Sequence, residues 1–194
     1  ASLKYLTEHI EQKNNLQWHT EVEAMKEVSC TRPKTDKLLP ETVLATVNKF
    51  AADDTPVATD VGQHQMWTAQ YYKFRKPRTF ITSGGLGTMG FGLGGAIGAC
   101  MASGKQTVLI TSDGSFGMNL NELATAVTYN IPLVIVLFNN GVLGMVRQWQ
   151  SLFFDGRFSA TTLGRATDFV KLAEAFGAKG YRAETPAEFK AAFA

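Results

Sequence analysis

Two uninterrupted apolar stretches stand out along the chain, and segments with helical spacing of apolar residues surround them. The stretches at 107–111 (Thr-Val-Leu-Ile-Thr) and 131–138 (Ile-Pro-Leu-Val-Ile-Val-Leu-Phe) predict strands that are buried on both faces. A shorter strand at 56–60 ends on Asp60. Because helical segments of about ten residues or more separate these strands, we expect an α/β fold, with a doubly wound parallel sheet and helices on both faces.

The helical segments are recognised by apolar residues three and four positions apart. The first begins behind Pro40, and its Val43, Leu44, Val47 and Phe50 share one face. A further short strand is expected near residues 180–183. Helices are expected at 41–52, 119–129, 142–150, 168–176 and 186–194.

The chain changes character near residue 38. Residues 1–37 are polar and charged, and we interpret them as a helix plus linker that arrives from an upstream domain. Residues 38–194 are expected to form one domain. Since Ala1 is not an initiator Met and the last helical pattern runs to Ala194, we expect a domain truncated at its C-terminus, within a longer protein.

Composition and charge narrow the functional classes. Hydrophobic residues make up 45% of the chain and charged residues 19%, which favours a packed core over disorder. A net charge of +2 does not point to a nucleic-acid or membrane-surface protein. Two cysteines, Cys30 and Cys100, make no disulfide framework, so we expect an intracellular chain. No apolar run approaches the ~20 residues of a membrane-spanning helix, and no export signal is expected.

The 18 glycines concentrate between Gly84 and Gly117. Residues 85–90 (Gly-Leu-Gly-Thr-Met-Gly) match the GxGxxG pattern of nicotinamide-dinucleotide binding, and Asp113 follows 23 residues later. The preceding segment, 78–83, is polar where the first strand of such a fold should be buried. Turns and close helix packing, through Gly92, Gly94, Gly95 and Gly98, are the other explanation of this glycine excess.

Polar residues follow the two long strands. Asp113 and Gly114 come after the first, and Asn139 and Asn140 after the second, so that Asp113 and Asn140 lie 27 positions apart. One helix and one strand return a parallel chain to the same sheet edge, where a carboxylate and an amide oxygen suit Mg²⁺. Gly114 would admit a phosphate to the backbone, and Ser115 could donate to it. A helix cap and an ordinary turn remain the alternatives.

The segment Ser112-Asp-Gly-Ser with Asn139-Asn140, where 24 residues separate Gly114 from Asn139, resembles the diphosphate–metal motif (GDG, then NN) of thiamine-diphosphate enzymes. Residues 62–67 (Gly-Gln-His-Gln-Met-Trp), 83–90 and 143–150 (Leu-Gly-Met-Val-Arg-Gln-Trp-Gln) resemble the large, catalytic subunits of acetolactate synthases. The resemblance runs from about Leu38 to the end of the chain. Ser112 replaces the usual first glycine of the motif, and Gly94-Gly95 replace a usual Pro-Ala.

This resemblance implies the thiamine-diphosphate-binding fold for residues 38–194 and a role for each motif residue. Asp113 and Asn140 would coordinate Mg²⁺, with the backbone carbonyl of Val142 as a third protein ligand. A neutral or protonated His64 could donate to a phosphate oxygen, and the alternative for it is a surface histidine. The residues expected to hold the diphosphate are Gln63, His64, Gly114 and Ser115.

The glycine-rich motif would bind the other end of the cofactor. The resemblance implies that the carbonyl of Gly87 and the N–H of Met89 bind the aminopyrimidine, and that the Met89 side chain lies beneath the cofactor and bends it. Met145 and Trp149 lie four positions apart and would line the substrate channel. On spacing alone, Met89 and Trp149 could equally be core residues.

The implied reaction is a thiamine-diphosphate- and Mg²⁺-dependent transfer. Pyruvate would be decarboxylated and joined to a second 2-ketoacid (pyruvate or 2-ketobutyrate), giving 2-acetolactate or 2-aceto-2-hydroxybutyrate for branched-chain amino acid synthesis. The activating glutamate would come from a partner subunit's pyrimidine-binding domain, not from Glu122, and FAD would bind only the full-length enzyme. We therefore expect this chain alone to lack synthase activity.

The resemblance also implies an assembly and a location. The full-length enzyme would be a homodimer or higher oligomer, with a regulatory small subunit as a possible partner. It would lie in the cytoplasm of a bacterium, or in a plastid or mitochondrion of a eukaryote. No nucleic acid or membrane partner is expected.

Three alternatives remain open. Another thiamine-diphosphate decarboxylase, oxidase or glyoxylate carboligase is disfavoured chiefly by residues 145–150. A nicotinamide oxidoreductase would use residues 85–90. A nucleic-acid or partner-binding module would use the basic residues 73–78 (Lys-Phe-Arg-Lys-Pro-Arg) beside Trp67 and Tyr71-Tyr72, although a solvated loop or subunit contact fits the nearly neutral chain.

Overall fold

The computed structural model describes residues 2–11, 14–28, 35–164 and 166–194. The chain divides into two units, Ala1–Asp36 and Lys37–Ala194. The first unit contains the helices α1 (Ser2–His9) and α2 (Leu16–Val28), where the sequence predicted one helix. Residues 29–34 of the expected linker, Cys30 among them, lie outside the described residues.

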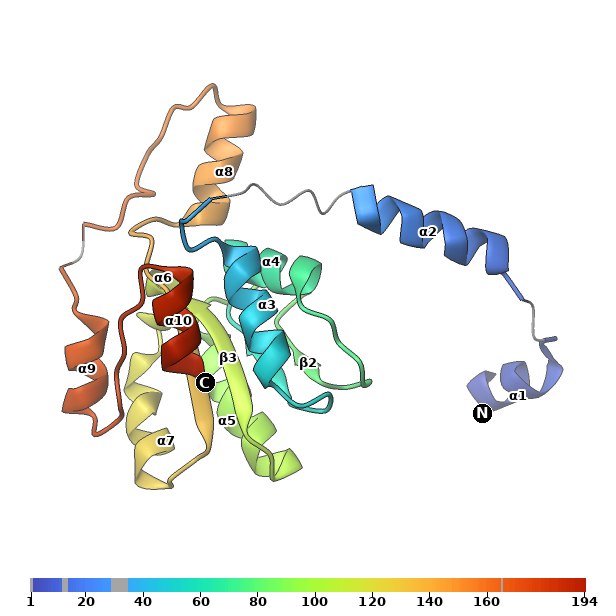
Figure 1. Cartoon of the computed structure of the whole chain (residues 1–194), viewed down its shortest axis with the longest axis horizontal. Coiled ribbons are helices and arrows are strands. Elements are labelled where there is room, and N and C mark those ends of the chain that lie inside the picture. The colour runs from blue at the N-terminus through green and yellow to red at the C-terminus, as the bar shows by residue number, and fades with distance from the viewer. Residues whose placement is uncertain (1, 12–13, 29–34, 165) are drawn as a thin grey trace. The chain divides into compact units, whose positions relative to one another are not determined.

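The second unit is built on a four-stranded sheet whose strands are all parallel (Figure 1). The strands lie in the order β2-β1-β3-β4. Thr107 pairs with Leu133, so β3 and β4 pair from their first residues, while Val57 at the start of β1 pairs with Val108, the second residue of β3. Their bounds are β1 (Val57–Thr59), β2 (Phe80–Ile81), β3 (Thr107–Ser112) and β4 (Leu133–Phe138).

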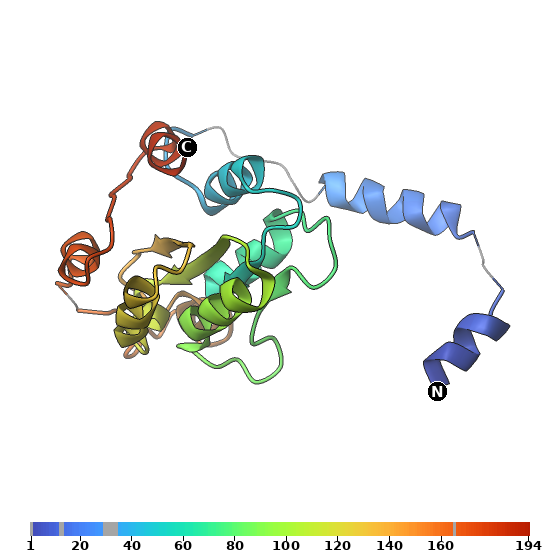
Figure 2. The ribbon, with the colours of Figure 1, turned by 90° about the horizontal axis from the view of Figure 1, so that it is seen from below.

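Helices cover both faces of this sheet, which confirms the predicted α/β class (Figure 2). On one face, apolar residues of α3 (Pro40–Phe50), α4 (Gln63–Tyr71) and α10 (Pro186–Phe193) pack with β1, β3 and β4. On the other face lie α5 (Phe91–Ser103), α7 (Leu123–Thr128) and α9 (Phe169–Ala175). The remaining helices are α6 (Asp113–Phe116), the 3-10 helix η1 (Leu120–Glu122) and α8 (Gly144–Phe153).

The helix expected at 41–52 forms as α3, with Pro40 in its first turn. Proline is tolerated there because the first N–H groups of a helix have no intrahelical partner. Val43, Leu44 and Val47 are buried against the sheet, as their spacing predicted. Phe50 does not join them: it is 42% exposed, and its ring contacts Phe193 at 6.3 Å between centroids.

Two predicted elements differ in the structure. The helix expected at 119–129 is divided into η1 and α7, with α6 as a separate turn directly after β3. The strand expected at 180–183 does not form. A Cβ on Gly180 would lie 2.9 Å from the carbonyl oxygen of Val170, so this segment runs against the start of α9, and Tyr181 is 68% exposed. Apolar and polar residues alternate there without a neighbouring strand to supply hydrogen bonds.

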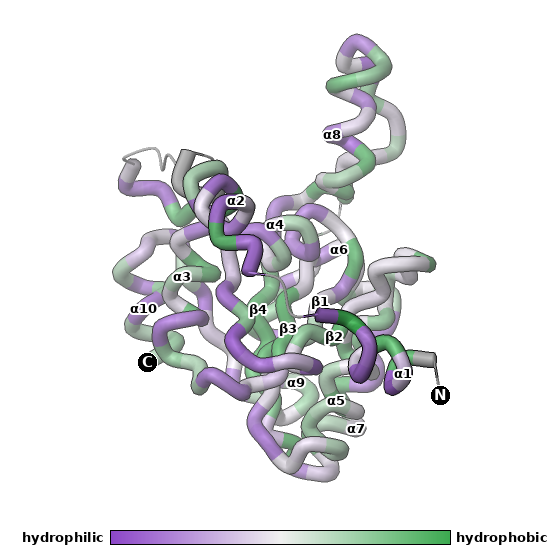
Figure 3. Tube along the Cα trace, turned by 90° about the vertical axis from the view of Figure 1, so that its right-hand side faces the viewer, coloured by the Kyte–Doolittle hydropathy of each residue, from purple (hydrophilic) through white to green (hydrophobic). Residues whose placement is uncertain are grey.

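Helix α8 and the loop after it project from the body of this unit (Figure 3). Their exposed apolar side chains are Val146, Trp149, Leu152, Phe153, Phe154 and Phe158. Gln150 fastens the loop to the helix, because its side-chain oxygen accepts from the Thr161 hydroxyl at 3.1 Å and its amide donates to the carbonyl of Ser159 at 3.0 Å. Among the helices of the described ranges, none has the length and apolar character that crossing a membrane requires.

Candidate functional site

The carboxyl ends of β1, β3 and β4 bring the polar loops of the sequence to one edge of the sheet. Ser112 pairs with Phe138, so Asp113 and Asn139 begin neighbouring loops. The backbone N–H of Gly141 donates to Oδ2 of Asp113 at 2.9 Å, which joins the two loops directly. The strand-end placement expected from the parallel pattern is therefore confirmed, although this does not test any role in binding.

Asp113 has an incompletely paired carboxylate. The residue is only 4% exposed, and its Oδ1 has no hydrogen-bond partner among the described residues. Leaving a buried carboxylate oxygen unpaired is costly, so such an atom commonly marks the place of a cation or water. Its surroundings hold no group of three or more His, Cys, Asp or Glu within the described part of the chain. Any metal here would therefore depend on amide and carbonyl oxygens as well as on Asp113.

The loop that carries Asn140 and Val142 is held from its other side. The N–H of Leu143 donates to the carbonyl of Thr161, and the N–H of Leu163 to that of Gly141, both at 2.8 Å. The side-chain oxygen of Asn140 accepts from the N–H of Val142 at 3.2 Å in a local turn. Asn140 therefore lies in an ordinary turn, as the alternative held. Its backbone nevertheless lies beside the Asp113 carboxylate.

Gly114 and Ser115 form a tightly packed turn after β3. A Cβ on Gly114 would lie 2.8 Å from Cδ2 of Leu143, so glycine lets that side chain approach the backbone, and Cε of Met89 lies at ordinary contact distance, 3.8 Å. Ser115 is fully buried, and its hydroxyl donates to the carbonyl of Val61 at 2.5 Å. Donation from this hydroxyl to a diphosphate would require it to leave Val61.

His64 is a buried, neutral histidine. It is 1% exposed, which excludes the surface alternative, and its Nε2 has no partner among the described residues. Burial lowers the pKa of His64 from 6.5 to about 4, because the charged ring loses its hydration, and a hydrogen bond with the Asp60 backbone opposes this only in part. Of the two protonation states expected, the structure favours the neutral one.

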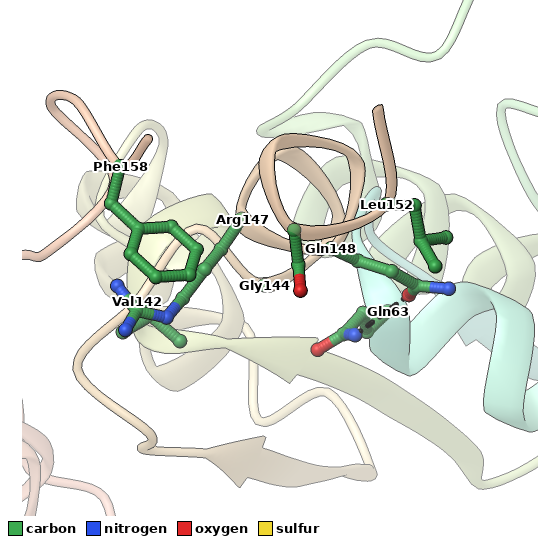
Figure 4. Close-up of a pocket in the computed structure, with 8 residues that line it drawn as sticks. Gln63, Val142, Gly144, Arg147, Gln148, Leu152 and Phe158 are labelled. Atoms are coloured by element: carbon green, nitrogen blue, oxygen red, sulfur yellow. Dashed lines mark hydrogen bonds between the residues drawn. The ribbon is translucent and has the colours of Figure 1, made fainter. Parts of the chain in front are cut away.

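Gln63 joins the start of α4 to α8. Its side-chain amide donates to Oε1 of Gln148 at 2.8 Å, and a Cβ on Gly144 would lie only 2.2 Å from its Oε1. Figure 4 shows Gln63 and Gln148 facing each other on one side of Gly144, with Arg147 against the ring of Phe158 on the other. The Arg147 guanidinium carbon lies 3.9 Å from that ring's centre. These residues line an open cavity of about 350 Å³.

A second cavity, of about 130 Å³, is lined by α4 and the residues before it, the glycine-rich loop before α5, the ends of β3 and β4, the loop after β4, and α8. Asp113, Gly114 and Ser115 are not among its lining residues. Gly87 borders it with a left-handed backbone, φ +69°, that a side chain would strain. Trp149 is not among the lining residues and is 60% exposed, so the core alternative for it is wrong. Predicted site residues that line this cavity are Gln63, His64, Gly87, Met89, Asn140, Val142 and Met145.

The sequence assigned no role to two residues of the site. Gln148 gave no signal beyond its place in the motif at 143–150. Asp60, which the sequence showed only as the last residue of a strand, is 1% exposed, and its Oδ1 accepts from the N–H of Gly90 at 2.8 Å. An acidic residue directly after a buried strand was the available signal.

The structure also bears on the alternative functions. The segment before residues 85–90 forms β2, an edge strand of two residues (Phe80–Ile81), not the buried first strand that a nicotinamide fold requires. In the basic segment 73–78, Arg75 is paired with Asp53 at 2.7 Å between Nη1 and Oδ1, and both side chains are largely exposed. This segment is an exposed loop.

Comparison with known proteins gives a consistent answer. The chain is 44% identical over 176 residues to the acetolactate synthase isozyme 3 large subunit of Escherichia coli (strain K12), covering 89% of this chain and 31% of that protein. It is 53% identical over 138 residues to a probable acetolactate synthase large subunit of Methanocaldococcus jannaschii, covering 71% and 23%. An Aspergillus candidus relative named "acetolactate synthase catalytic subunit, mitochondrial" is 41% identical over 202 residues, covering 98% and 29%.

The chain thus spans about a third of the length of the curated relatives it matches. Residues 60–194, more than half of the chain, match the family described as "Thiamine pyrophosphate enzyme, C-terminal TPP binding domain", thiamine pyrophosphate being another name for thiamine diphosphate. The buried strand ends, the polar loops at one edge and this match agree: the chain belongs to the thiamine pyrophosphate enzymes and carries their C-terminal cofactor-binding domain.

Proposed function

We propose that this chain is the cofactor-binding part of an acetolactate synthase large subunit. The whole protein would decarboxylate pyruvate and join the remaining two-carbon unit to a second 2-ketoacid. The names of the relatives and the motif at 143–150 support this choice over other enzymes of the family. The observation that carries the binding role is the buried, unpaired Oδ1 of Asp113 beside the loop of Asn140.

In this proposal Asp113 and Asn140 coordinate Mg²⁺, together with the backbone carbonyl of Val142. Mg²⁺ prefers hard oxygen ligands and usually keeps several positions for water and phosphate oxygens. The cation would neutralise the buried Asp113 oxygen that the protein leaves unpaired. The amide of Asn140 would turn from its local bond with Val142, which is exposed and 3.2 Å long, to face the metal.

The diphosphate would lie against the turns after β1 and β3. Gly114 has no side chain of its own to shield its backbone N–H from a phosphate, although Leu143 packs where a Cβ would lie, and His64 presents its unpaired Nε2 from a buried position. A neutral ring must carry its proton on Nε2, or bind one more proton, to donate to phosphate. The negative charge of the diphosphate would favour that protonation. Gln63 and Ser115 would also hold the diphosphate. To do so, Gln63 would release Gln148, and Ser115 would release the carbonyl of Val61.

The remaining residues would position the ring end of the cofactor and the substrates. Gly87 and Met89 would bind the aminopyrimidine through their backbone, while the Met89 side chain supports the bent cofactor. Bound thiamine diphosphate supplies an electron sink for decarboxylation of the 2-ketoacid. Met145 lines the cavity and Trp149 is exposed on the projecting α8, so both are available to contact pyruvate or the larger 2-ketobutyrate.

Several properties of the whole protein belong to the same proposal. They are branched-chain amino acid synthesis as the pathway, FAD bound by another domain, a homodimer or higher oligomer, and a regulatory small subunit. Residues 1–37 would be the tail of an upstream domain and residues 38–194 the cofactor-binding domain. A bacterial protein would work in the cytoplasm, and a eukaryotic one in a plastid or in a mitochondrion, the location that the name of the fungal relative gives.

Calorimetric titration with thiamine diphosphate tests this binding role. We expect binding that requires Mg²⁺ and falls by at least tenfold in Asp113→Asn, because the neutral amide gives up about 1.4 kcal/mol or more of charge interaction. Asp155→Asn is the matched control, since the Asp155 side chain is 96% exposed in the loop after α8. Binding that is as tight in EDTA, or unchanged in Asp113→Asn, would contradict the proposal. Acetolactate formation from pyruvate by the full-length protein tests the reaction separately.

A further inference from the structure

Asp60 connects three separate elements at the centre of the site. Its Oδ1 accepts from the N–H of Gly90 at 2.8 Å and from its neighbour Val61 at 3.0 Å. Its Oδ2 lies 3.4 Å from the hydroxyl of Thr111. These bonds tie the end of β1 to β3 and to the residue directly before α5. A carboxylate that is 1% exposed is held here by N–H and O–H groups, since no cation pairs with it among the described residues.

The carboxylate acts as a cap that α5 lacks in its own sequence. Gly90, the residue before the helix, has a left-handed backbone with φ +91° and no side chain to cap with. Asp60 accepts that N–H from 30 positions away in the chain. A negative charge at the start of a helix is favoured by the helix dipole and by its unpaired N–H groups. The helix also packs closely on Asp60, because a Cβ on Gly92 would lie 2.9 Å from the Asp60 Cβ and backbone N.

The glycine loop, defined here as residues 84–90, has few other ties to the sheet. Gly87 and Thr88 donate only to Ser83, at 3.1 Å to its carbonyl and 3.1 Å to its Oγ respectively. The part at 84–88 is exposed. Asn119 reaches the carbonyl of Gly90 at 3.4 Å, a long bond from the opposite side. The bond to Asp60 is therefore the short, charge-assisted link between the loop and the buried sheet.

We infer that Asp60 is a positioning residue for the cofactor, which acts through Gly90 to hold Gly87 and Met89 at the depth where they can bind its aminopyrimidine. This inference rests on the proposed function, which assigns the aminopyrimidine to that loop. The carboxylate itself has no contact with the cofactor in this role. Asp60 fixes where the loop ends and α5 begins, and the Met89 side chain reaches the Gly114 turn from there.

Amide hydrogen exchange and thiamine diphosphate titration, on the same protein samples, test this role. In the wild-type chain we expect the Gly90 N–H to exchange at least tenfold more slowly than those of Gly84 and Gly85, although all lie in one loop. Asp60→Ala should remove that protection, leave β3 and β4 protected, and weaken thiamine diphosphate binding by about tenfold. Asp60→Asn keeps an acceptor oxygen, so it should retain most of the Gly90 protection and most of the thiamine diphosphate affinity. Thr111→Val removes the two long contacts of the Thr111 hydroxyl, 3.4 Å to Oδ2 of Asp60 and 3.5 Å to the carbonyl of Ser112; it is the control and should change neither.

Each other outcome overturns the inference. Gly90 exchanging as fast as Gly84 in the wild-type chain removes its basis, and this result needs no variant to fold. Faster exchange in Asp60→Ala spread evenly over β3 and β4 assigns Asp60 a general structural role instead. If Asp60→Ala loses the Gly90 protection but binds thiamine diphosphate as tightly as the wild-type chain, the anchoring of the loop has no effect on cofactor binding. A wild-type chain that binds no thiamine diphosphate defeats the proposed function, while the exchange data still decide whether Asp60 anchors the loop.

Discussion

Replacing Gly92 by alanine tests the close packing of α5 on the cofactor edge of the sheet. A Cβ at this position would lie 2.9 Å from three atoms, the Cβ and backbone N of Asp60 and Cδ1 of Leu109. Only the leucine atom belongs to the end of a flexible side chain. The other two are fixed by the strand, so the helix must move outward. Gly94 is the matched control on the same helix, because a Cβ there meets nothing within 4 Å.

The two substitutions should have opposite signs. Alanine is more favourable than glycine inside a helix by about 1 kcal/mol, and Gly94→Ala should gain up to that amount in the free energy of unfolding. Gly92→Ala gains the same but incurs an overpacking cost of about 1–3 kcal/mol, so we expect a net loss of up to about 2 kcal/mol. The difference between the variants should equal that overpacking cost, about 1–3 kcal/mol, because both share the same gain in helix propensity.

Urea denaturation followed by circular dichroism measures this difference. The midpoint should rise for Gly94→Ala and fall for Gly92→Ala, with similar slopes, since both variants expose the same surface on unfolding. Gly92→Ala should also weaken thiamine diphosphate binding, because α5 carries the glycine loop at its start. Equal midpoints for the two variants, or a stabilised Gly92→Ala, would refute the argument that α5 is in steric contact with Asp60.

Two further predictions concern His64 and Gln63. Because the pKa of His64 falls from 6.5 to about 4 on folding, the unfolded chain binds the proton first, so stability should be lost as pH falls from 6.5 to 4. The loss should reach about 3 kcal/mol in the free energy of unfolding, measured by urea titration at each pH. It should shrink in His64→Gln but not in His9→Gln, a control whose histidine is exposed. An unchanged dependence of stability on pH in His64→Gln would contradict the buried, neutral ring. A double-mutant cycle of Gln63→Ala and Gln148→Ala should give a coupling of about 0.5–1.5 kcal/mol, and additive effects would show that their hydrogen bond contributes nothing to stability.

The main strands could be predicted because their signal is local. The apolar runs at 107–111 and 131–138 suit only a strand covered on both faces, and β3 and β4 form there. Their parallel direction then determined where the chain returns, so the meeting of the Asp113 and Asn139 loops followed from connectivity alone. The start of α3 at Pro40 was similarly local.

The errors arose where a pattern needs a partner that the sequence does not name. Residues 180–183 alternate like a strand, yet among the described residues no strand lies beside them to complete a ladder. Gly94 and Gly98 were expected to serve close packing with Gly92, but neither would bring a Cβ within 4 Å of another atom. Gly94 lies two positions from Gly92 and therefore on nearly the opposite side of α5, so Gly92 faces the sheet while Gly94 and Gly98 are exposed.

The site residues could be predicted from the sequence only in part, for the same reason. His64 was placed at a strand end by its motif, but its burial and neutral state depend on the elements packed around it. The bonds from Gln63 to Gln148 and from Asp60 to Gly90 join residues 85 and 30 positions apart. No local periodicity encodes such pairs, which is why Gln148 and Asp60 emerged only from the structure.

A crystal structure of the chain grown with thiamine diphosphate and Mg²⁺ tests the central claim most directly. The account predicts a metal at about 2.0–2.1 Å from the Asp113 carboxylate and the Asn140 amide oxygen, with the diphosphate between the Gly114 turn and His64. Diphosphate bound elsewhere, or a metal that Asp113 does not coordinate, would contradict the claim that the buried, unpaired oxygen of Asp113 is a magnesium ligand.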